Sequence, residues 1–247
     1  MSGYSKEYEI FYFQIDRFGE ASLVTILGFL EDCATAHSEA IGLGIEYLTS
    51  QGTCWILNRW HLKMERFPHL GEKIVVETYP LAFQRFYGKR DFLIKDTQGT
   101  LIGKASSLWI YLNIDKRRPT RIPAHFASQY GVSDLQDTDD SFEDFAELME
   151  SSSEISFHVR RSDIDTNGHV NNTRYAEWML EGIPEDIMSD YRLQQFEIMY
   201  KKETKYGTDI ISRCQKADNT EPEYLHRISD KGDGVELASG KTVWTHR

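Results

Sequence analysis

Hydrophobic and polar residues form two sets of patterned segments, and each set begins with a strand pattern followed by a helical one. The first strand is predicted over 8–15, where aromatic and aliphatic residues predominate. A helix should follow, because apolar residues recur at helical spacing behind Ser22, which can accept a hydrogen bond as an N-cap. The residues on its apolar face are Leu23, Ile26, Leu27, Leu30 and Ala34.

The same order of elements returns in the second half of the chain. The segment 154–161 has the pattern of a strand, and Asn172 can cap the helix that follows. That helix should stop near Gly182 and Pro184, because proline cannot continue a helix. Its apolar residues are Tyr175, Trp178 and Met179.

Four more strands are predicted after each helix. Residues that favour turns, chiefly glycine, proline, asparagine and aspartate, mark most of the breaks between them. The predicted strands are Cys54–Arg66, Lys73–Gln84, Phe86–Asp96 and Leu101–Asn113 in the first half, and Leu193–Glu203, Thr208–Ala217, Tyr224–Asp230 and Val235–Trp244 in the second. One helix on a mostly antiparallel sheet, repeated once, predicts an α+β fold with two tandem units.

An acidic stretch, DLQDTDDSFEDFAELME, separates the two halves. We interpret it as a solvated linker with one short helix over Phe142–Met149. The predicted organisation is an N-terminal domain over 1–130, the acidic linker over 131–153, and a C-terminal domain over 154–247.

Charge and composition exclude several classes of protein. The chain has 28 Lys and Arg against 39 Asp and Glu, a net charge of −11, which argues against nucleic-acid binding. No apolar stretch approaches the roughly 18 to 20 residues that span a bilayer, and no secretion signal is recognisable, so we expect a cytoplasmic protein without a membrane partner. The cysteines Cys33, Cys54 and Cys214 are widely spaced, which predicts reduced thiols and no metal site.

The segment DIDTNGHVNNTRYAEW, residues 163–178, is unusually polar for the entry to a helix. It contains two aspartates, three asparagines and one histidine. Polar side chains there can converge on the first turn of the helix, where backbone N–H groups favour an anion or a developing oxyanion. This loop is therefore the candidate active site, suited to a carbonyl substrate such as a thioester.

The corresponding loop of the first half, residues 16–22, has neither histidine nor asparagine. Matching Leu30 with Leu180 gives an offset of 150, whereas matching Glu9 with Glu154 gives 145. We therefore predict five extra residues between strand and helix in the second half, and chemistry in that half alone. An insertion with a purely structural role is the alternative.

Several motifs resemble acyl-ACP thioesterases, which release free fatty acids from acyl carrier protein (ACP). In the second half these are DIDTNGHVNNTRYAEWMLEGIP from Asp163 and YKKETKYGTDI from Tyr200. In the first half they are WILNRWHLKMER from Trp55, FPHLGEKIVVETYP from Phe67 and KASSLWIYLNIDKRRPTRIP from Lys104. Single-domain thioesterases of the hydroxybenzoyl-CoA type resemble the HVNN core alone.

The resemblance implies a tandem, or double, hotdog fold, in which each antiparallel sheet wraps around one long helix. It also implies hydrolysis of fatty acyl-ACP to free fatty acid and ACP without a cofactor. The partner would be ACP carrying a phosphopantetheine-linked acyl chain. By position, the catalytic residues of the family fall on Asp165, Asn167, His169 and Glu203.

Thioester hydrolysis needs an activated nucleophile, donors for the oxyanion and a proton for the leaving thiolate. We expect Asn167 to bind the carbonyl oxygen, His169 to position water or carry its proton, and Glu203 to act as the base. Direct attack by Asp165, which would form an anhydride, is the alternative. We assign mainly structural roles to the neighbouring Asp163, Asn171 and Asn172.

Plant members of the family have a cysteine directly after this glutamate, whereas this chain has Thr204, which disfavours a thiolate mechanism. Three other functions are left open. The chain could be an acyl-CoA thioesterase of the hydroxybenzoyl-CoA hotdog type, a hotdog dehydratase, or a non-catalytic acyl-binding hotdog protein.

The N-terminal domain is the predicted wall of the acyl-chain pocket, since its helix is the more apolar. ACP is acidic, so docking should use a local basic surface, and we favour the groups that flank the candidate site. The basic groups are Lys116, Arg117, Arg118 and Arg121, then Arg160 and Arg161, then Lys201, Lys202 and Lys205. A monomer and a homodimer are both compatible with a tandem pair.

Overall fold

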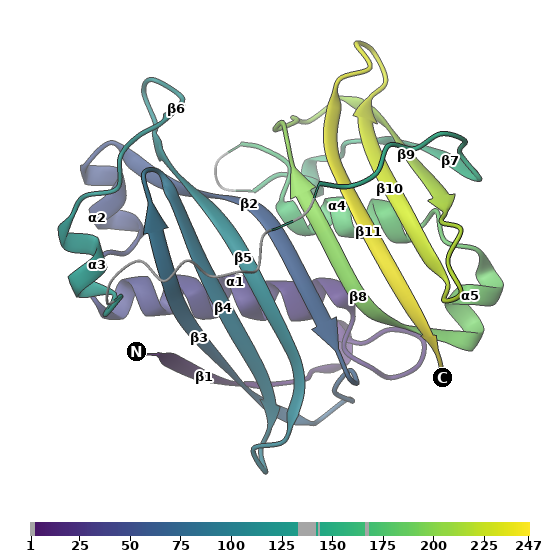
Figure 1. Ribbon diagram of the computed structural model, residues 1–247, viewed down its shortest axis with the longest axis horizontal. Helices are drawn as coiled ribbons and strands as arrows, with labels where there is room; N and C mark the ends of the chain where they lie inside the picture. The colour runs from purple at the N-terminus through teal and green to yellow at the C-terminus, as the bar shows by residue number, and fades with distance from the viewer. Residues whose placement is uncertain (1–2, 133–141, 143, 166–167) are drawn as a thin grey trace. The chain divides into compact units, whose positions relative to one another are not determined.

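The computed structural model describes residues 3–132, 142, 144–165 and 168–247. Two compact units divide the chain: unit 1 comprises 1–58 and 65–141, and unit 2 comprises 59–64 and 142–247. Strand β2 (Thr53–Met64) contributes its first residues to unit 1 and its segment 59–64 to unit 2. Figure 1 shows the elements of both units along the chain.

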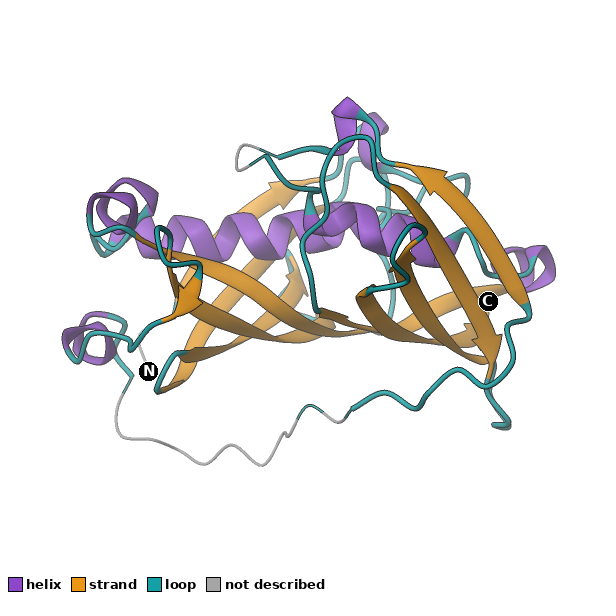
Figure 2. Ribbon diagram, turned by 90° about the horizontal axis from the view of Figure 1, so that it is seen from above, coloured by secondary structure: helices purple, strands orange, loops and turns teal. Residues whose placement is uncertain are grey.

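Unit 1 contains a long helix and an antiparallel sheet. Its elements are β1 (Tyr4–Glu9), the 3-10 turn η1 (Tyr12–Gln14), α1 (Leu23–Ala40), α2 (Ile45–Ser50), β3 (Lys73–Gln84), β4 (Tyr87–Asp96), β5 (Leu101–Asn113), β6 (Arg118–Pro119) and α3 (His125–Gln129). The strand order is β1-β3-β4-β5-β2, with β6 paired to β5. The α1 helix lies against one face of these strands (Figure 2).

Unit 2 repeats this arrangement with a shorter helix. Its elements are β7 (Ser153–His158), the 3-10 turn η2 (Arg161–Asp163), α4 (Asn172–Leu180), α5 (Glu185–Asp190), β8 (Tyr191–Tyr200), β9 (Asp209–Lys216), β10 (Glu223–Asp230) and β11 (Glu236–His246). The strand order is β2-β8-β11-β10-β9-β7, and the pairs are antiparallel. A helix on a curved antiparallel sheet, present twice, is the predicted α+β double hotdog.

The apolar face predicted for the first helix is confirmed. The Ser22 side chain accepts a hydrogen bond from the backbone N–H of Thr25 and so caps α1. The five apolar residues predicted for the helix face, Leu23, Ile26, Leu27, Leu30 and Ala34, are all buried. Burial of this face against the sheet contributes apolar area to the core of unit 1.

In unit 2 the N-cap is Asn171, one residue before the predicted Asn172. The helix stops at Leu180, as the glycine and proline that follow it predicted. Met179 of this helix packs over Gly240 of β11, where an added Cβ would lie 2.5 Å from the backbone oxygen of Glu197 on β8 and 2.9 Å from Sδ of Met179. Glycine is needed at that position because a Cβ would collide with the backbone of the neighbouring strand.

The strand predictions succeed best in the interior of the sheets. Strands β3 and β5 have the predicted bounds. The six other strands that were predicted after the two helices differ from the prediction by at most three residues at either end. The first strand was placed wrongly, because it spans 4–9 and the aromatic residues after it form η1. The linker helix was also wrong, since residues 142 and 144–149 contain no helix, and the short helices α2, α3 and α5 were not predicted.

The predicted five-residue insertion is wrong. Strands β1 and β7 begin 149 residues apart, at Tyr4 and Ser153, and helices α1 and α4 begin 149 residues apart, at Leu23 and Asn172. The turns η1 and η2 have the same offset. The two loops between strand and helix are therefore equal in length, and only their side chains distinguish them.

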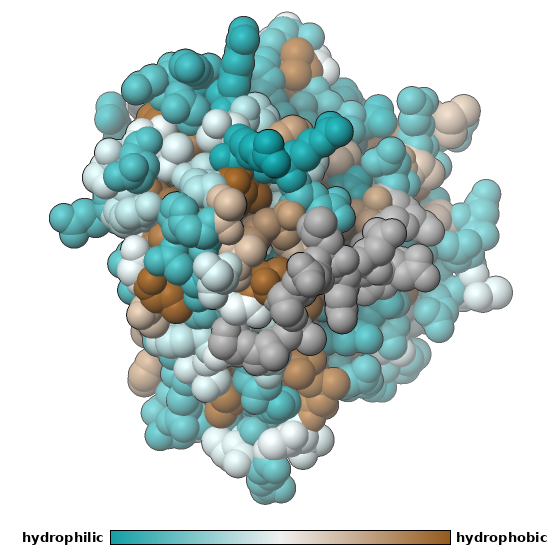
Figure 3. Space-filling model, turned by 60° about the vertical axis from the view of Figure 1, so that its left-hand side comes forward, coloured by the Kyte–Doolittle hydropathy of each residue, from teal (hydrophilic) through white to brown (hydrophobic). Residues whose placement is uncertain are grey.

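The face of the molecule drawn in Figure 3 is largely hydrophilic. On the face in Figure 3 hydrophobic residues form small separate areas among hydrophilic ones. No helix among the described residues combines the length and the apolarity that crossing a bilayer requires.

Acid is expected to destabilise unit 2 through His226, which is fully buried in β10. Its Nε2 lies 2.9 Å from Oγ1 of Thr242, and burial lowers its pKa to about 3. An unfolded histidine binds a proton below pH ~6.5. Between pH 6.5 and 3 the unfolded state therefore binds more protons, so the free energy of unfolding should fall with pH by on the order of a few kcal/mol.

Denaturant unfolding measured at several pH values tests this expectation. The slope of unfolding free energy against pH over this range should be smaller in His226→Gln than in the wild type. Equal slopes would assign the acid sensitivity to other groups.

Candidate active site

The loop between β7 and α4 is fixed by a buried carboxylate, that of Asp163, whose side chain is only 1% exposed. It accepts hydrogen bonds from the backbone N–H of Arg160 at 2.8 Å and from Nη2 of the Arg160 guanidinium at 3.0 Å, and Nε of Arg174 lies 3.7 Å away. Burial acts to raise the pKa of Asp163, but the Arg160 contacts outweigh it and hold the pKa below its usual value. Asp163 thus has the structural role predicted for it.

The next turn of the loop is built by Asp165. Oδ1 of Asp165 accepts a hydrogen bond from the backbone N–H of His169 at 3.2 Å, and the two backbones exchange a further bond from Asp165 N–H to His169 O at 2.8 Å. Gly168 supplies the left-handed conformation that this turn requires, with φ of +79°. The turn holds the backbone of His169 in place.

The imidazole of His169 points at Glu203, which follows β8. Nε2 of His169 lies 3.2 Å from Oε2 of Glu203, and their side chains are 21% and 37% exposed. The backbone fixes this pair, because the N–H of Val170 donates to the carbonyl of Thr204 at 3.0 Å. A histidine and a carboxylate in contact at a solvent-accessible position can exchange a proton.

Two tyrosines, Tyr175 and Tyr200, connect the start of α4 with the end of β8. The hydroxyl of Tyr200 donates to the carbonyl of Asn172 at 3.1 Å, which ties the end of β8 to the start of α4. The ring of Tyr175 packs edge-on against that of Tyr200, with centroids 5.6 Å apart. Burial raises the pKa of Tyr175, and the negative charge of Glu203 raises it further, so the phenol stays neutral. Sequence analysis named Tyr175 only as an apolar residue of the predicted helix and gave no sign of its nearness to Glu203.

Three of the four predicted catalytic residues come together: Asp165, His169 and Glu203. The fourth, Asn167, lies outside the described residues. The side-chain oxygen of Asn171 accepts hydrogen bonds from the backbone N–H and the hydroxyl of Thr173, which is the capping role expected for it.

Unit 1 contains the same aspartate turn, but it has no histidine at the position of His169. Oδ1 of Asp16 accepts hydrogen bonds from the backbone N–H groups of Phe18 and Glu20, and Gly19 has φ of +77°. Asp16 corresponds to Asp165 at the offset of 149, and Glu20 corresponds to His169. The aspartate is therefore shared by both loops, whereas the histidine is found in unit 2 only.

Glu203 also has a counterpart in unit 1. The N–H of Ala21 donates to the carbonyl of Pro68 as that of Val170 donates to Thr204, so Pro68 corresponds to Thr204. The residue before Pro68 is the buried Phe67, in the position of Glu203. The His169–Glu203 pair is thus the feature that distinguishes the two loops chemically.

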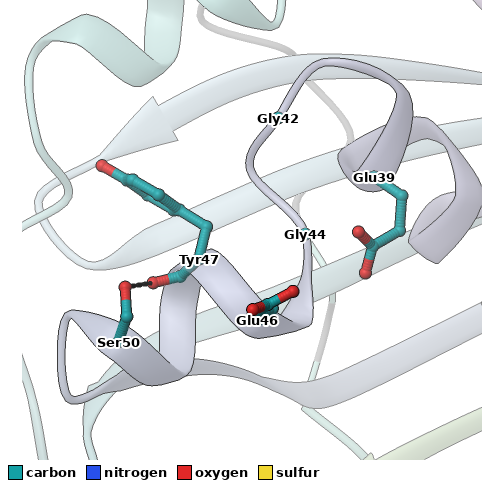
Figure 4. Close-up of a pocket in the computed structure, with 6 residues that line it drawn as sticks. All are labelled: Glu39, Gly42, Gly44, Glu46, Tyr47 and Ser50. Atoms are coloured by element: carbon teal, nitrogen blue, oxygen red, sulfur yellow. Dashed lines mark hydrogen bonds between the residues drawn. The ribbon is translucent and has the colours of Figure 1, made fainter.

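A separate pocket lies in unit 1, beside α2 (Figure 4). Glu39, Glu46, Tyr47 and Ser50 contribute side chains to it, and Oε1 of Glu39 accepts the backbone N–H of Ile45 at 2.8 Å. This pocket has no histidine and holds none of the predicted catalytic residues. Among the described residues, no group of three or more His, Cys, Asp or Glu side chains is placed to hold a metal ion.

Comparisons with known proteins identify the family of this chain. The model of the acyl-ACP thioesterase N-terminal domain matches residues 2–130, and that of the acyl-ACP thioesterase C-terminal domain matches residues 146–246. Oleoyl-acyl carrier protein thioesterase 1 of Arabidopsis thaliana is 24% identical, with 98% of this chain and 75% of the relative covered. Dodecanoyl-[acyl-carrier-protein] hydrolase of Cinnamomum camphora is 26% identical, with 90% and 62% covered.

Solved structures have the same fold. An acyl-ACP thioesterase from Bacteroides thetaiotaomicron superimposes with a TM-score of 0.88 at 23% identity, covering 98% of both chains. The 12:0-ACP thioesterase from Umbellularia californica gives a TM-score of 0.87 at 21% identity, covering 99% of this chain and 94% of that one.

The double hotdog fold and the two matched domain models define a thioester hydrolase. With both domain models matched over most of its length, the chain belongs to the acyl-ACP thioesterase family.

Proposed function

We propose that the chain hydrolyses fatty acyl-ACP through water activated by Glu203. The observation that carries this proposal is the 3.2 Å contact between Nε2 of His169 and Oε2 of Glu203. The Glu203 carboxylate would accept a proton as the water oxygen bonds to the thioester carbonyl carbon. The carbon–sulfur bond then breaks, and the imidazole offers the proton a path to the leaving thiolate of the phosphopantetheine arm.

Asn167 is proposed as the oxyanion donor on the family resemblance and on its place in the sequence, two residues before His169.

For Asp165 we propose a positioning role rather than nucleophilic attack. The support is the equivalent turn around Asp16, which forms without a histidine or a catalytic glutamate. Asp165→Asn should keep most of kcat, because an asparagine Oδ1 can accept the same N–H, whereas Asp165→Ala should lower kcat by about tenfold or more. Steady-state kinetics on acyl-ACP measure both. If Asp165→Asn is as inactive as the alanine variant, the carboxylate itself takes part in the reaction.

ACP docking is proposed at the basic residues beside the site, with one change from the sequence prediction. Arg160 holds the buried Asp163, so reversing its charge would disturb the loop itself. Lys202 and Lys205 are exposed, and Nζ of Lys202 lies 3.7 Å from a carboxylate oxygen of Asp233. Lys202 and Lys205 are therefore better probes of docking than Arg160.

Lys202→Glu with Lys205→Glu should lower kcat/KM for acyl-ACP by about tenfold and reduce its dependence on salt. Hydrolysis of an acyl-pantetheine mimic should change little. The exposed Lys116→Glu in unit 1 is the matched control. Equal losses on both substrates would place the docking surface elsewhere.

The remaining assignments are proposals of the same kind. We infer that residues 1–130 form the domain that holds the acyl chain and residues 154–247 the catalytic domain, joined by the linker 131–153.

A cytoplasmic location is proposed on the three cysteines, which form no disulfide in the described residues. The relatives above from Arabidopsis thaliana and Cinnamomum camphora are named as chloroplastic, so cell fractionation is the test. Light scattering on the purified protein would separate a monomer from a homodimer.

A further inference from the structure

Unit 2 holds an exposed arginine on an aromatic ring close to the His169–Glu203 pair. The guanidinium carbon of Arg161 lies 4.5 Å from the centroid of the Tyr206 ring. Both residues are exposed, and Tyr206 is 51% exposed. Stacking on the ring limits the positions of the guanidinium and leaves its N–H groups able to bind an anion.

The backbone places these two side chains beside the site. Tyr206 follows Glu203 by three residues, so their Cα atoms lie within about 11 Å of each other. Arg161 is in η2, on the loop between β7 and α4. The N–H of Gly207 donates to the carbonyl of Val159 at 3.1 Å, which joins the two segments. A ligand bound to Arg161 is therefore within reach of the catalytic pair.

Arg161 forms no ion pair with a carboxylate of the described residues, whereas other basic residues nearby do. Its neighbour Arg160 binds Asp163 at 3.0 Å. On the other segment, Nζ of Lys202 lies 3.7 Å from a carboxylate oxygen of Asp233. Arg161 can therefore bind an anionic ligand without first breaking an ion pair within the described part of the chain.

Both units have the same backbone contact at this place. In unit 1 the N–H of Gly71 donates to the carbonyl of Ile10 at 2.8 Å. This bond corresponds to the one from Gly207 to Val159 in unit 2. The two glycines have φ of +78° and +83°, so the turns match as well. The side chains on the two turns can thus be compared position by position.

The comparison shows that the cation is present beside the catalytic pair and absent from its counterpart. Tyr12 is in the position of Arg161 at the offset of 149. Leu70, which precedes the glycine of the turn in unit 1, is in the position of Tyr206. Of two equivalent positions, the one in the unit with the His–Glu pair carries the positive charge, which associates the charge with the chemistry.

The proposed substrate has an anion at a suitable distance from its thioester. A phosphopantetheine arm contains one phosphate, and an extended arm spans roughly 16 Å from the phosphate to the thioester sulfur at ordinary bond lengths. The separation of Glu203 and Tyr206, lengthened by their side chains, is within that span. A guanidinium binds two phosphate oxygens through parallel hydrogen bonds.

We propose that Arg161, held on the ring of Tyr206, binds the phosphate of the phosphopantetheine arm while the thioester lies at the His169–Glu203 pair. The ligand is the arm carried by ACP, and this assignment rests on the proposed function. Because the phosphate is remote from the reacting atoms, the contact should lower KM and leave kcat unchanged.

Hydrolysis of dodecanoyl-pantetheine and of dodecanoyl-4′-phosphopantetheine by the full chain tests the proposal, since the two substrates differ only in the phosphate. The wild type should have a kcat/KM about tenfold higher for the phosphorylated substrate, with the difference in KM. Arg161→Met should lose this preference and hydrolyse both equally well. Equal kcat/KM values in the wild type would overturn the proposal, and so would an unchanged preference in Arg161→Met.

Conservative and matched variants separate this role from a general effect of charge. Arg161→Lys keeps the charge without the fork and should retain only part of the preference, whereas Tyr206→Phe keeps the ring and should retain all of it. The matched control is Arg17→Met in unit 1, where the guanidinium carbon lies 5.0 Å from the centroid of the Phe18 ring. It should keep the full preference. Loss of the preference in Arg17→Met would overturn a specific phosphate site.

A binding measurement separates failure of this site from failure of the proposed function. Calorimetric titration with 4′-phosphopantetheine and with pantetheine needs no turnover. The wild type should bind the phosphorylated thiol about tenfold more tightly, and Arg161→Met should bind both equally. A wild type without hydrolase activity that keeps this preference would refute the hydrolase alone. Hydrolysis of both thioesters with no preference in either assay would refute the phosphate site alone.

Coenzyme A contains the same phosphorylated arm, so the source of the phosphate needs its own comparison. Arg161→Met should lower kcat/KM for dodecanoyl-ACP by about the same factor as for dodecanoyl-4′-phosphopantetheine. A loss confined to dodecanoyl-CoA would contradict the arm of ACP as the ligand.

Discussion

Replacing His169 by alanine should lower kcat for acyl-ACP by about 100-fold or more while changing KM little. The reason is that the imidazole contacts Glu203, 3.2 Å away, and would act on the proton only as the thioester is attacked. Measurement of kcat and KM with purified acyl-ACP tests this.

A matched control is available in the same unit. His158 also faces a carboxylate, with Nδ1 2.7 Å from Oδ1 of Asp209, but both side chains are about 60% exposed. His158→Ala should keep kcat near the wild-type value. Normal turnover by His169→Ala, with a folded structure shown by circular dichroism, would remove the imidazole from the mechanism.

Replacing Glu203 by glutamine should lower kcat by about 1,000-fold, since the amide keeps the shape of the side chain but cannot accept the proton of water. The backbone contact between Val170 and Thr204 does not involve the carboxylate, so the loop should stay in place. Thermal unfolding of the variant checks that point independently of activity.

Glu236→Gln is the comparison variant for this substitution. The Glu236 carboxylate is bound by Lys201, with Nζ 2.7 Å from Oε1, and takes no part in the proposed chemistry. It should keep kcat near the wild-type value. Activity retained by Glu203→Gln would move the role of base to another carboxylate, and Asp165 would be the first to test.

The fold was predictable where local pattern and burial agree. Buried and partly exposed residues alternate along most of β3 and over residues 104–108 of β5, and both ends of each strand were predicted. The first strand failed because its apolar pattern continues into Tyr12 and Phe13, whose side chains are 81% and 83% exposed on a turn. Hydrophobicity alone does not distinguish an exposed aromatic turn from a buried strand.

The comparison of the two loops failed because it matched the wrong residues. Matching the dipeptide at Glu9 with that at Glu154 pairs residues that are not equivalent, because the true offset places Glu9 with His158. That offset follows from where the strands and helices begin, and the hydrogen bonds from Ala21 to Pro68 in unit 1 and from Val170 to Thr204 in unit 2 agree with it.

The candidate site was predictable in part. The polar density of 163–178 identified the loop, because few structural roles need so many polar side chains before a helix. Nothing in that segment indicates which acid lies opposite His169. Glu203 is 34 residues further along the chain, and the fold alone brings the two within 3.2 Å.

The most direct test of the account is turnover by the wild-type chain on matched thioesters of ACP and coenzyme A. Dodecanoyl, palmitoyl and oleoyl substrates should each be assayed by release of free fatty acid. The account predicts that kcat/KM for at least one acyl-ACP exceeds that for the matched acyl-CoA by about tenfold or more, and that Glu203→Gln abolishes the release. Absence of fatty acid from every acyl-ACP, or a consistent preference for coenzyme A, would contradict it.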